Sequence, residues 1–396
     1  MGTIITGKTP PTTNKNYYGD YAVFIKPTDI SEQCKFTYET EEMYSKLAAE
    51  KYESSLIPKG AICVPCIGTI GTKMTMAPCD CYTNQSINSI VCNDRYDNEY
   101  VYYLIKNFLP GLKSYNLGTA SGREYVSKSN FEKIELVAEQ DKTIQKKIGE
   151  FLSRYDSLIE NYQKQIKLLE EAAQRLYKEW FVDLHFPGHE NTKIVDGVPE
   201  GWEKKKVKEV CDTTSGGTPS RSKTEFYTGD ILWVKTKELN DDFIFDTEEK
   251  ITKDAIRNSS AKMVPSGSIL MAMYGATIGK LGIATKELSC NQACCVFLLP
   301  EDSTLRLYLY NWLLNSRTLL ISMGKGAAQP NLSQDMIKNL EVVVPSSCLL
   351  AKFDSKVKPL YRIMSYHSSQ IRLLTEARDR LLPKMMSGEI KIESLN

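Results

Sequence analysis

The sequence lacks the features of a membrane-spanning or secreted protein. None of its apolar runs approaches the roughly 20 residues that a transmembrane helix needs. Its N-terminal segment has neither the basic stretch nor the apolar core of a signal peptide. The eleven cysteines are therefore expected to be free thiols in a reducing compartment. We predict a cytoplasmic protein with no membrane partner.

An excess of positive charge is also missing. The chain carries 50 Lys and Arg residues against 49 Asp and Glu residues, which gives a net charge of +1. Because nucleic-acid-binding proteins are often basic overall, this balance counts mildly against such a function. It does not exclude the function, since binding needs only a local basic surface. The length of 396 residues is enough for two or three domains with sizeable cores.

Catalytic and cofactor-binding motifs are absent as well. An adenine methyltransferase would need a glycine-rich cofactor loop and an Asn/Asp-Pro-Pro-aromatic motif, and the only Pro-Pro pair is Pro10-Pro11. The stretch Gly275-Ala-Thr-Ile-Gly279-Lys280 is one residue too short between its glycines for a phosphate-binding loop. The three histidines, His185, His189 and His367, do not form a convincing catalytic or metal-binding set. We predict no catalytic residue and no cofactor in this chain.

What the sequence does contain is an internal repeat with a period of about 205–210 residues. The motifs keep the same order in both copies, which chance rarely produces. The matching stretches are Gly7-Lys-Thr9-Pro10 with Gly217-Thr218-Pro219, Pro58-Lys-Gly60 with Pro265-Ser-Gly267, Gly68-Thr-Ile-Gly71 with Gly275-Ala-Thr-Ile-Gly279, Asn84-Gln85 with Asn291-Gln292, Ser127 with Ser333, and Gln165-Ile-Lys-Leu-Leu-Glu-Glu-Ala with Gln370-Ile-Arg-Leu-Leu-Thr-Glu-Ala.

Each copy changes from a β-rich pattern to a helical one. Short β-branched and aromatic runs separated by Gly, Pro and Asn come first. Apolar residues at alternating steps of three and four then predict a long helix, roughly 60 Å in the first copy. Pro359 is expected to bend the second helix or mark its start, and Pro383 to end it. The seam residues are Ile148, Tyr155, Tyr162, Leu169, Leu176 and Trp180 in the first copy and Leu360, Ile371, Leu374 and Leu381 in the second, with His367 packed on the second seam.

The sequence thus predicts an α+β fold with two β-rich domains in tandem repeat. They are separated by two long helices, which form an antiparallel coiled coil with pseudo-twofold symmetry. The predicted parts are domain 1 at 1–139, helix 1 at 140–184, a linker at 185–198, domain 2 at 199–346, helix 2 at 347–385 and a tail at 386–396.

Four cysteines of the first domain allow two interpretations. Cys63-Val-Pro-Cys66 followed by Cys79-Asp-Cys81 supplies enough ligands for zinc, although the spacing matches only loosely. The second copy has Leu270 and Met273 near the first pair, so the domain does not need a metal to fold. In a strand-like run, cysteine also serves as a small apolar residue. We favour a packing role and predict no metal site.

Polar loops at corresponding places in the two copies are candidates for DNA contact. Lysine can neutralise a phosphate, Arg can read guanine, and Gln or Asn can read adenine. The same residue types also occur in ordinary solvated loops and turns, so both interpretations remain open. The candidates are Lys15, Lys26, Lys73, Arg123 and Tyr125 in the first copy and Arg221, Lys223, Lys235, Lys237, Lys280, Gln329 and Asn331 in the second.

The order of these elements resembles the specificity (S) subunit of Type I restriction–modification enzymes. The resemblance covers nearly the whole chain, and it depends on several motifs that are individually weak. They are the Gly-Thr-Pro openings, the glycine loops followed by Asn-Gln, Gly326-Ala-Ala-Gln-Pro-Asn-Leu-Ser333, Glu139-Gln140, Trp180-Phe-Val-Asp183, Phe186-Pro, Pro199-Glu-Gly-Trp202 and Arg380-Leu-Leu-Pro-Lys384-Met-Met-Ser-Gly-Glu-Ile390.

The resemblance implies a non-catalytic subunit that binds double-stranded DNA. Each β-rich domain would be a target-recognition domain that reads one half of a bipartite target. The helices, through the seam residues, would set the spacing and dock two methyltransferase (M) subunits, and restriction (R) subunits can join them. S-adenosylmethionine, Mg²⁺ and ATP are then expected in the partner subunits and not in this chain.

One departure from the repeat suggests a role for the tail. A lead-in, Gly197-Val-Pro-Glu-Gly-Trp-Glu-Lys-Lys-Lys-Val207, precedes the second Gly-Thr-Pro, whereas the first copy has none. We expect the C-terminal Gly388-Glu-Ile-Lys-Ile-Glu393 to complete the first domain. Two alternatives to the specificity subunit remain: a methyltransferase–specificity fusion that lost its catalytic half, and a non-catalytic coiled-coil scaffold that binds proteins through its two domains.

Overall fold

The computed structural model describes residues 1–68, 70–116, 118, 124–324 and 331–392. The chain divides into two compact units, Met1–Asn161 with Ile371–Asn396, and Tyr162–Gln370. Both units contain strands and helices, which confirms the α+β class. No helix in the described ranges is long and apolar enough to cross a membrane.

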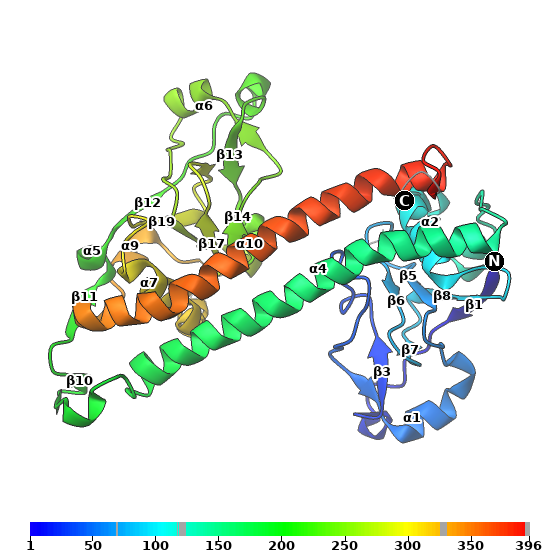
Figure 1. Ribbon diagram of the computed structural model, residues 1–396, viewed down its shortest axis with the longest axis horizontal. Helices are drawn as coiled ribbons and strands as arrows, with labels where there is room; N and C mark the ends of the chain where they lie inside the picture. Colours follow the sequence, from blue (N-terminus) through cyan, green and yellow to red (C-terminus); the bar gives the residue numbers. More distant parts are fainter. Residues whose placement is uncertain (69, 117, 119–123, 325–330, 393–396) are drawn as a thin grey trace. The chain divides into compact units, whose positions relative to one another are not determined.

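The first unit has two small sheets with helices beside them (Figure 1). One sheet has the order β1-β8-β5-β6 and the other has the order β2-β4-β3-β7. Their strands are β1 (Gly2–Thr6), β2 (Tyr18–Gly19), β3 (Ala22–Ile25), β4 (Met43–Tyr44), β5 (Ile62–Pro65), β6 (Thr75–Met76), β7 (Tyr82–Thr83) and β8 (Ile87–Cys92). The shorter helices are α1 (Lys46–Lys51), α2 (Asn98–Phe108) and α3 (Lys128–Glu132).

Local sequence explains why α2 forms and where it lies. The Asp97 side chain accepts a hydrogen bond from the backbone N–H of Tyr100 at 3.0 Å and so caps the N-terminus of the helix. The next six residues, Tyr100–Ile105, are all buried. A helix that is buried on every side must be covered by more than one element. The covering residues include Ile62 and Val64 of β5, Ile148 and Leu152 of α4 (Lys142–Tyr177) and Leu382 of α10 (Ser347–Met386).

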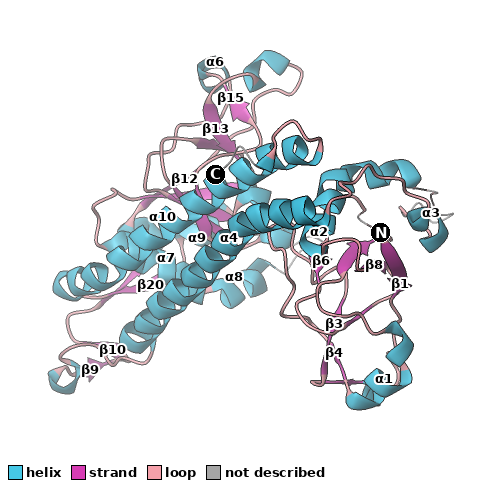
Figure 2. Cartoon of the chain, turned by 45° about the vertical axis from the view of Figure 1, so that its right-hand side comes forward, coloured by secondary structure: helices cyan, strands magenta, loops and turns pink. Residues whose placement is uncertain are grey.

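The second unit repeats this plan with additions. Its larger sheet has the order β12-β19-β16-β17-β14, and smaller sheets are β15-β13-β18, β11-β20 and β10-β9. The strands are β9 (Ile194–Val195), β10 (Val198–Pro199), β11 (Glu203–Lys206), β12 (Asp212–Ser215), β13 (Ile231–Val234), β14 (Asp242–Ile244), β15 (Lys250–Ile251), β16 (Ile269–Ala272), β17 (Leu281–Ala284), β18 (Ser289–Cys290), β19 (Cys294–Leu298) and β20 (Glu341–Val344). The shorter helices are α5 (Val207–Val210), α6 (Lys253–Arg257), α7 (Leu305–Asn315), α8 (Arg317–Gly324) and α9 (Gln334–Lys338). Figure 2 shows β13, β15 and α6 gathered in one part of this unit.

Corresponding elements confirm the internal repeat in three dimensions. In each unit a strand that follows the Gly-Thr-Pro loop pairs in parallel with a strand just before the Asn-Gln motif: β3 with β7, and β13 with β18. Ser127 caps α3 by accepting from the N–H of Asn130, and Ser333 caps α9 by accepting from the N–H of Met336. The repeat is therefore one of backbone geometry as well as of sequence.

The two long helices pack against each other in antiparallel directions. In the first unit, Asp156 of α4 contacts Arg378 of α10. In the second, the rings of Tyr162 and His367 stack with centroids 4.6 Å apart, and Tyr177 meets Phe353. Residue numbers rise along α4 as those of their partners fall along α10. Figures 1 and 2 show the two helices side by side.

The apolar stripe on these helices is wider than the predicted seam. Ile148 and Trp180 are buried, whereas the other eight predicted seam residues are half-buried. The residue after a seam position is often the more buried one: Leu176 and Leu381 are half-buried, whereas Tyr177 and Leu382 are 4% and 5% exposed. Each helix buries one side against its partner and another against a domain, so two adjacent rows of residues are covered.

The second helix neither begins at Pro359 nor ends at Pro383, as two of the predictions had it. Helix α10 runs from Ser347 to Met386 through both Pro359 and Pro383. A proline inside a helix removes one backbone hydrogen bond. Burial of Tyr361, Leu382 and other residues beside the prolines offsets this loss.

The C-terminal tail packs on the first unit. Ile390 and Ile392 contact the core cluster that contains α2 and β5. In the second unit, β11 of the lead-in pairs with β20. The counterpart of β20 in the first unit, residues 134–137, is not assigned to a strand, and Val137 is 94% exposed. The prediction that the tail completes the first domain still needs an experiment.

Candidate nucleic-acid interface

The Gly-Thr-Pro loop is held in the same way in both units. The Thr9 hydroxyl bonds the Gln85 amide oxygen, and Thr218 bonds Gln292 identically. A tyrosine hydroxyl then donates to the proline carbonyl of each loop: Tyr18 to Pro10 at 2.9 Å and Tyr227 to Pro219 at 2.6 Å. The sequence identified these motifs but gave no sign that they touch. Together they form a common frame on which different side chains are displayed.

A second shared feature joins the glycine loop to the polar loop some 50 residues later. In the first unit, Ile67 forms a bridge with Tyr125, and in the second, Tyr274 forms a bridge with Asn331. Tyr125 and Asn331, both predicted DNA contacts, therefore stand at equivalent places. Gly68 and Gly275 have positive φ angles of 87° and 69°, and a Cβ on either would meet no atom within 4 Å. The other two candidates from these loops, Arg123 and Gln329, lie outside the described residues.

Lysine near the glycine loop has different surroundings in the two units. Lys280 pairs with Asp241 at 2.7 Å, and Asp241 also binds Arg317 and the N–H of Leu281. The Nε of Arg317 donates to the carbonyl of Gly279 at 3.1 Å. Lys280 thus helps to tether the loop. Lys73 of the first unit is half-buried and has no acidic partner among the described residues.

Asp241 and Arg317 help to hold the glycine loop of the second unit, and sequence reasoning missed both. Asp241 has a positive φ of 66°, which costs energy for a residue other than glycine. Its partners lie 39 residues away at Lys280 and 76 residues away at Arg317. No spacing rule links such distant positions. A missed residue of this kind is visible only once the chain is folded.

The predicted lysines at the end of β3 and β13 are held by paired glutamates. Lys26 lies 2.8 Å from Glu41 and 3.3 Å from Glu42. Lys235 lies 2.7 Å from Glu248 and 3.0 Å from Glu249. These lysines are already neutralised inside the protein. They fix the position of a neighbouring loop and are poorly suited to bind a phosphate.

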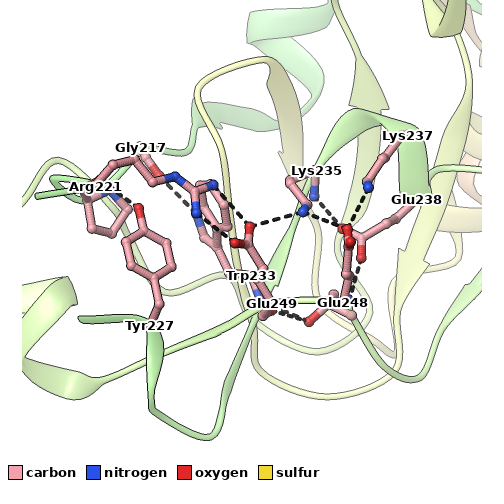
Figure 3. Close-up of polar contacts among 11 residues, drawn as sticks. Gly217, Arg221, Tyr227, Trp233, Lys235, Lys237, Glu238, Glu248 and Glu249 are labelled. Atoms are coloured by element: carbon pink, nitrogen blue, oxygen red, sulfur yellow. Dashed lines mark hydrogen bonds and ion pairs between the residues drawn. The ribbon is translucent and has the colours of Figure 1, made fainter. Parts of the chain in front are cut away.

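Arg221 is part of a larger network in the second unit (Figure 3). Its guanidinium forms two hydrogen bonds with Glu249, at 2.6 and 3.0 Å, and lies over the rings of Tyr227 and Trp233. The indole of Trp233 donates to the carbonyl of Gly217 at 3.0 Å. The bond from Arg221 lowers the pKa of Glu249 to about 2. Lys237, also in Figure 3, pairs with Glu248 at 2.5 Å.

Two of the predicted cations are exposed and free of acidic partners within the described parts of the chain. Lys15 begins the short helical turn Lys15–Tyr17, and Lys223 directly precedes the turn Thr224–Tyr227. The ammonium group of Lys223 lies 5.0 Å from the ring centroid of Phe226. The two turns are at corresponding places in the repeat. Lys15 and Lys223 are therefore the cations best placed to meet a phosphate.

Three of the four cysteines that were considered as zinc ligands pack in the interior of the first unit, whereas Cys79 is exposed. Every cysteine of the chain is a free thiol, and Cys63, Cys66 and Cys81 are buried. Burial raises the pKa of Cys63 and Cys66 to about 11, so their thiols stay protonated at neutral pH. In the described ranges, no group of three potential His, Cys, Asp or Glu ligands could hold a metal ion.

Comparisons with known proteins agree with this geometry. The family described as the Type I restriction modification DNA specificity domain matches residues 1–171 and 199–348. Over the whole chain, the sequence is 27% identical to the specificity subunit of the Type I restriction enzyme MjaIX of Methanocaldococcus jannaschii, 93% of which is covered. It is 25% identical to the HindI specificity subunit of Haemophilus influenzae over 313 residues, which are 63% of this chain and 68% of that protein. The fold is similar to the crystal structure of a Type I S subunit from M. genitalium, with a TM-score of 0.59 at 16% identity, covering 97% of this chain and 93% of that one.

Proposed function

Because the chain belongs to the Type I restriction modification DNA specificity family, we propose that it is the DNA-reading subunit of such a system, with each of its two copies reading one half of a bipartite target. The observation that carries this proposal is a shared frame with different exposed side chains. Thr9–Gln85 and Thr218–Gln292 hold equivalent loops, while the neighbouring residues differ. That arrangement suits two recognition surfaces for different base sequences.

Within each recognition surface we assign separate roles to the charged residues. Lys15 and Lys223 would contact phosphates, because both are exposed and lack acidic partners in the described chain. Lys26, Lys235 and Arg221 would position loops, because their charges are already paired. Tyr125 and Asn331, beside the glycine loops, would face bases.

The chain itself would be non-catalytic, with methylation supplied by methyltransferase subunits. Exposed apolar residues on the long helices suit two such partners. Leu158 and Leu168 of α4 are 46% and 64% exposed, and Ile363 and Leu373 of α10 are 44% and 46% exposed. With the offset of 205 that aligns Gln165 with Gln370, Leu158 corresponds to Ile363 and Leu168 to Leu373. Each of these exposed residues of α4 thus has an apolar counterpart on α10, which suits equivalent contacts with two copies of one subunit.

The docking proposal predicts which helix residues matter for assembly. Leu158→Asp and Leu168→Asp should each weaken binding of one methyltransferase subunit about 30-fold, since a buried apolar contact would be replaced by a charge. Leu47→Asp, at an equally exposed residue on α1, is the matched control. Native mass spectrometry of the complex measures the effect. Full occupancy of both sites in the α4 variants would contradict the proposed patches.

Methylome sequencing tests the proposed function as a whole. A host expressing this chain with its cognate methyltransferase is compared with a host expressing the methyltransferase alone. We expect a bipartite methylated motif only when this chain is present. Absence of a new motif, with both proteins folded and associated, would overturn the proposal. A steep loss of DNA affinity with salt would further separate DNA reading from protein scaffolding.

A further inference from the structure

A buried ion pair joins the two long helices in the first unit. Arg378 of α10 and Asp156 of α4 are only 4% and 6% exposed, and their side chains are in direct contact. The hydroxyl of Tyr103 on α2 also donates to the Asp156 carboxylate. The Nε of Arg378 donates to Asp379 at 2.8 Å. The carboxylate and the guanidinium thus form an ion pair that is almost inaccessible to solvent.

The two equivalent positions in the second unit carry no charged side chain. With the offset of 205, Asp156 corresponds to Tyr361 and Arg378 to Ala173, both buried. Helices α2 and α7 align with an offset of 207, so Tyr103 corresponds to Tyr310, which meets Tyr361 edge-on with ring centroids 5.6 Å apart. Ala173, Tyr310 and Tyr361 belong to one apolar cluster. The two copies therefore share a helix-packing geometry but differ completely in the chemistry at this point.

Because of this difference, the possible pairings of the two helices are not equally stable. Because the copies are equivalent, α4 could pair with α4 of a second chain in the same antiparallel register. Asp156 would then face Ala173 of the second chain. Likewise, pairing of two α10 helices would place Arg378 opposite Tyr361. Either alternative removes the buried Asp156–Arg378 ion pair and leaves each charge without its partner on the facing helix, which is unfavourable.

We propose that the Asp156–Arg378 pair makes the first half of the chain accept only a second half as its partner. The pair thereby prevents two copies of this chain from assembling through two first halves or two second halves. This inference goes beyond DNA reading, because it concerns which halves share one particle. Its consequence is a particle with two different recognition domains, hence a target with two different half-sites.

The helix contact between Tyr162 and His367 does not provide this selectivity. These residues correspond to each other under the same offset, and their rings stack at 28°. Pairing of like halves would bring Tyr162 onto Tyr162, or His367 onto His367. Burial lowers the pKa of His367, so neither combination would bury a charge at neutral pH. Of these two helix contacts, the Asp156–Arg378 pair is therefore the one that distinguishes like halves from unlike halves.

The test uses the whole folded chain and cleaves it only afterwards. A protease site is placed in the exposed β9–β10 hairpin, where Ile194 and Val195 are 59% and 58% exposed. Cleaved protein is mixed with an isotope-labelled cleaved copy, and native mass spectrometry identifies the pairs. The native chain should give only pairs of a first with a second half, even when halves exchange between molecules.

The double variant Asp156→Tyr, Arg378→Ala gives each copy the residue of the other. It should produce pairs of like halves in amounts approaching the statistical mixture. The matched control is Arg380→Ala, which removes an exposed ion pair with Glu376 on the same helix. This control should keep the native selectivity. Like pairs in the native protein, or none in the double variant, would overturn the proposal.

Uncut chains provide a second measurement in case cleavage separates or unfolds the halves. Two differently tagged copies of the chain are refolded together at high concentration, and mixed dimers are isolated through both tags. The double variant should form several-fold more mixed dimer than the native chain. Equal amounts from the two proteins would contradict the role assigned to Asp156 and Arg378.

Discussion

The two copies of this chain agree in their frame and differ in their charged groups. Thr–Gln bonds and tyrosine–proline bonds recur at equivalent positions. Beside them, each copy pairs one lysine with two glutamates, but in the second copy Arg221 also binds one of these glutamates and lies over Trp233. Backbone-organising contacts are therefore conserved between the copies, while the residues around them have diverged. Divergence on a fixed frame allows one fold to read two different sequences.

The largest effect is expected where α4 and α10 contact each other, because the two units differ there in buried charge. Arg378→Met leaves Asp156 buried without its partner, and should destabilise the first unit by about 3–5 kcal/mol. Tyr361→Phe, at the counterpart of Asp156 in the second unit, should cost only about 1 kcal/mol. Urea denaturation followed by hydrogen exchange of α2 and α7 peptides measures both. Similar losses at the two junctions would mean that the ion pair has little structural importance.

Deletion of residues 386–396 tests whether the tail completes the first domain. The deletion removes Met386, Ile390 and Ile392 from the core cluster of that unit. We expect the first unit to lose about 2–3 kcal/mol of stability. All four tryptophans (Trp180, Trp202, Trp233 and Trp312) lie in the second unit, so their fluorescence should show an unchanged transition there. An unchanged melting transition of the first unit would show that the tail is dispensable.

A pH-dependent difference between the units should follow from Glu170. Burial, followed by the charges of Asp242 and Asp241, raises its pKa from 4.5 to about 7. The folded state therefore holds this proton more tightly than the unfolded state does. The resulting stabilisation is complete below about pH 4.5 and is lost as the pH rises through about 7. Glu170 is partly accessible, so we expect a difference of about 1–2 kcal/mol across this range.

Glu170→Gln should remove that pH dependence from the second unit. Tryptophan fluorescence during urea denaturation at pH 5 and pH 8 reports the change. Relative to the native chain, the variant should gain stability at pH 8. Glu171→Gln, next to it and exposed, is the control. The assignment of the raised pKa to Glu170 would be wrong if the native slope persisted in the Glu170 variant.

The smallest effects distinguish lysines that contact DNA from lysines that form ion pairs within the protein. Lys15→Ala and Lys223→Ala should each weaken DNA binding a few-fold and reduce the salt dependence by about one counterion. Lys235→Ala should instead destabilise its loop by about 1 kcal/mol, because it breaks two ion pairs. Filter binding over a salt series gives the slopes. If DNA affinity depended equally on salt in the Lys223 and Lys235 variants, the assignment of different roles to these lysines would be wrong.

The sequence predicted the repeat, the two long helices and the framing motifs because each of these leaves a local pattern. Gly-Thr-Pro, Asn-Gln and the three-four spacing of apolar residues are all visible within short windows. It did not predict that Lys26, Lys235 and Lys280 would be neutralised. Their acidic partners lie 13 to 39 residues away, and loop geometry decides which carboxylates reach them.

The local sequence pattern also predicted the buried residues of the long helices incompletely. The spacing identified the buried side to within one residue, but it missed Leu152, Ile159, Tyr177 and Leu382, which are all buried. A pattern of period 3.5 assumes one partner helix, whereas α4 and α10 each also contact a domain. Likewise, nothing in the local sequence around Asp156 or Arg378 indicates that they meet. Contacts between residues more than 200 positions apart follow from folding alone.

Exchange of one recognition domain tests the central claim most directly. Residues 1–139 are replaced by the corresponding domain of another specificity subunit with a known target, and the methylome of the host is sequenced with the cognate methyltransferase present. We predict a motif in which one half-site has changed and the other half-site and the spacer remain as before. A change in both half-sites would contradict the account of two independent reading domains.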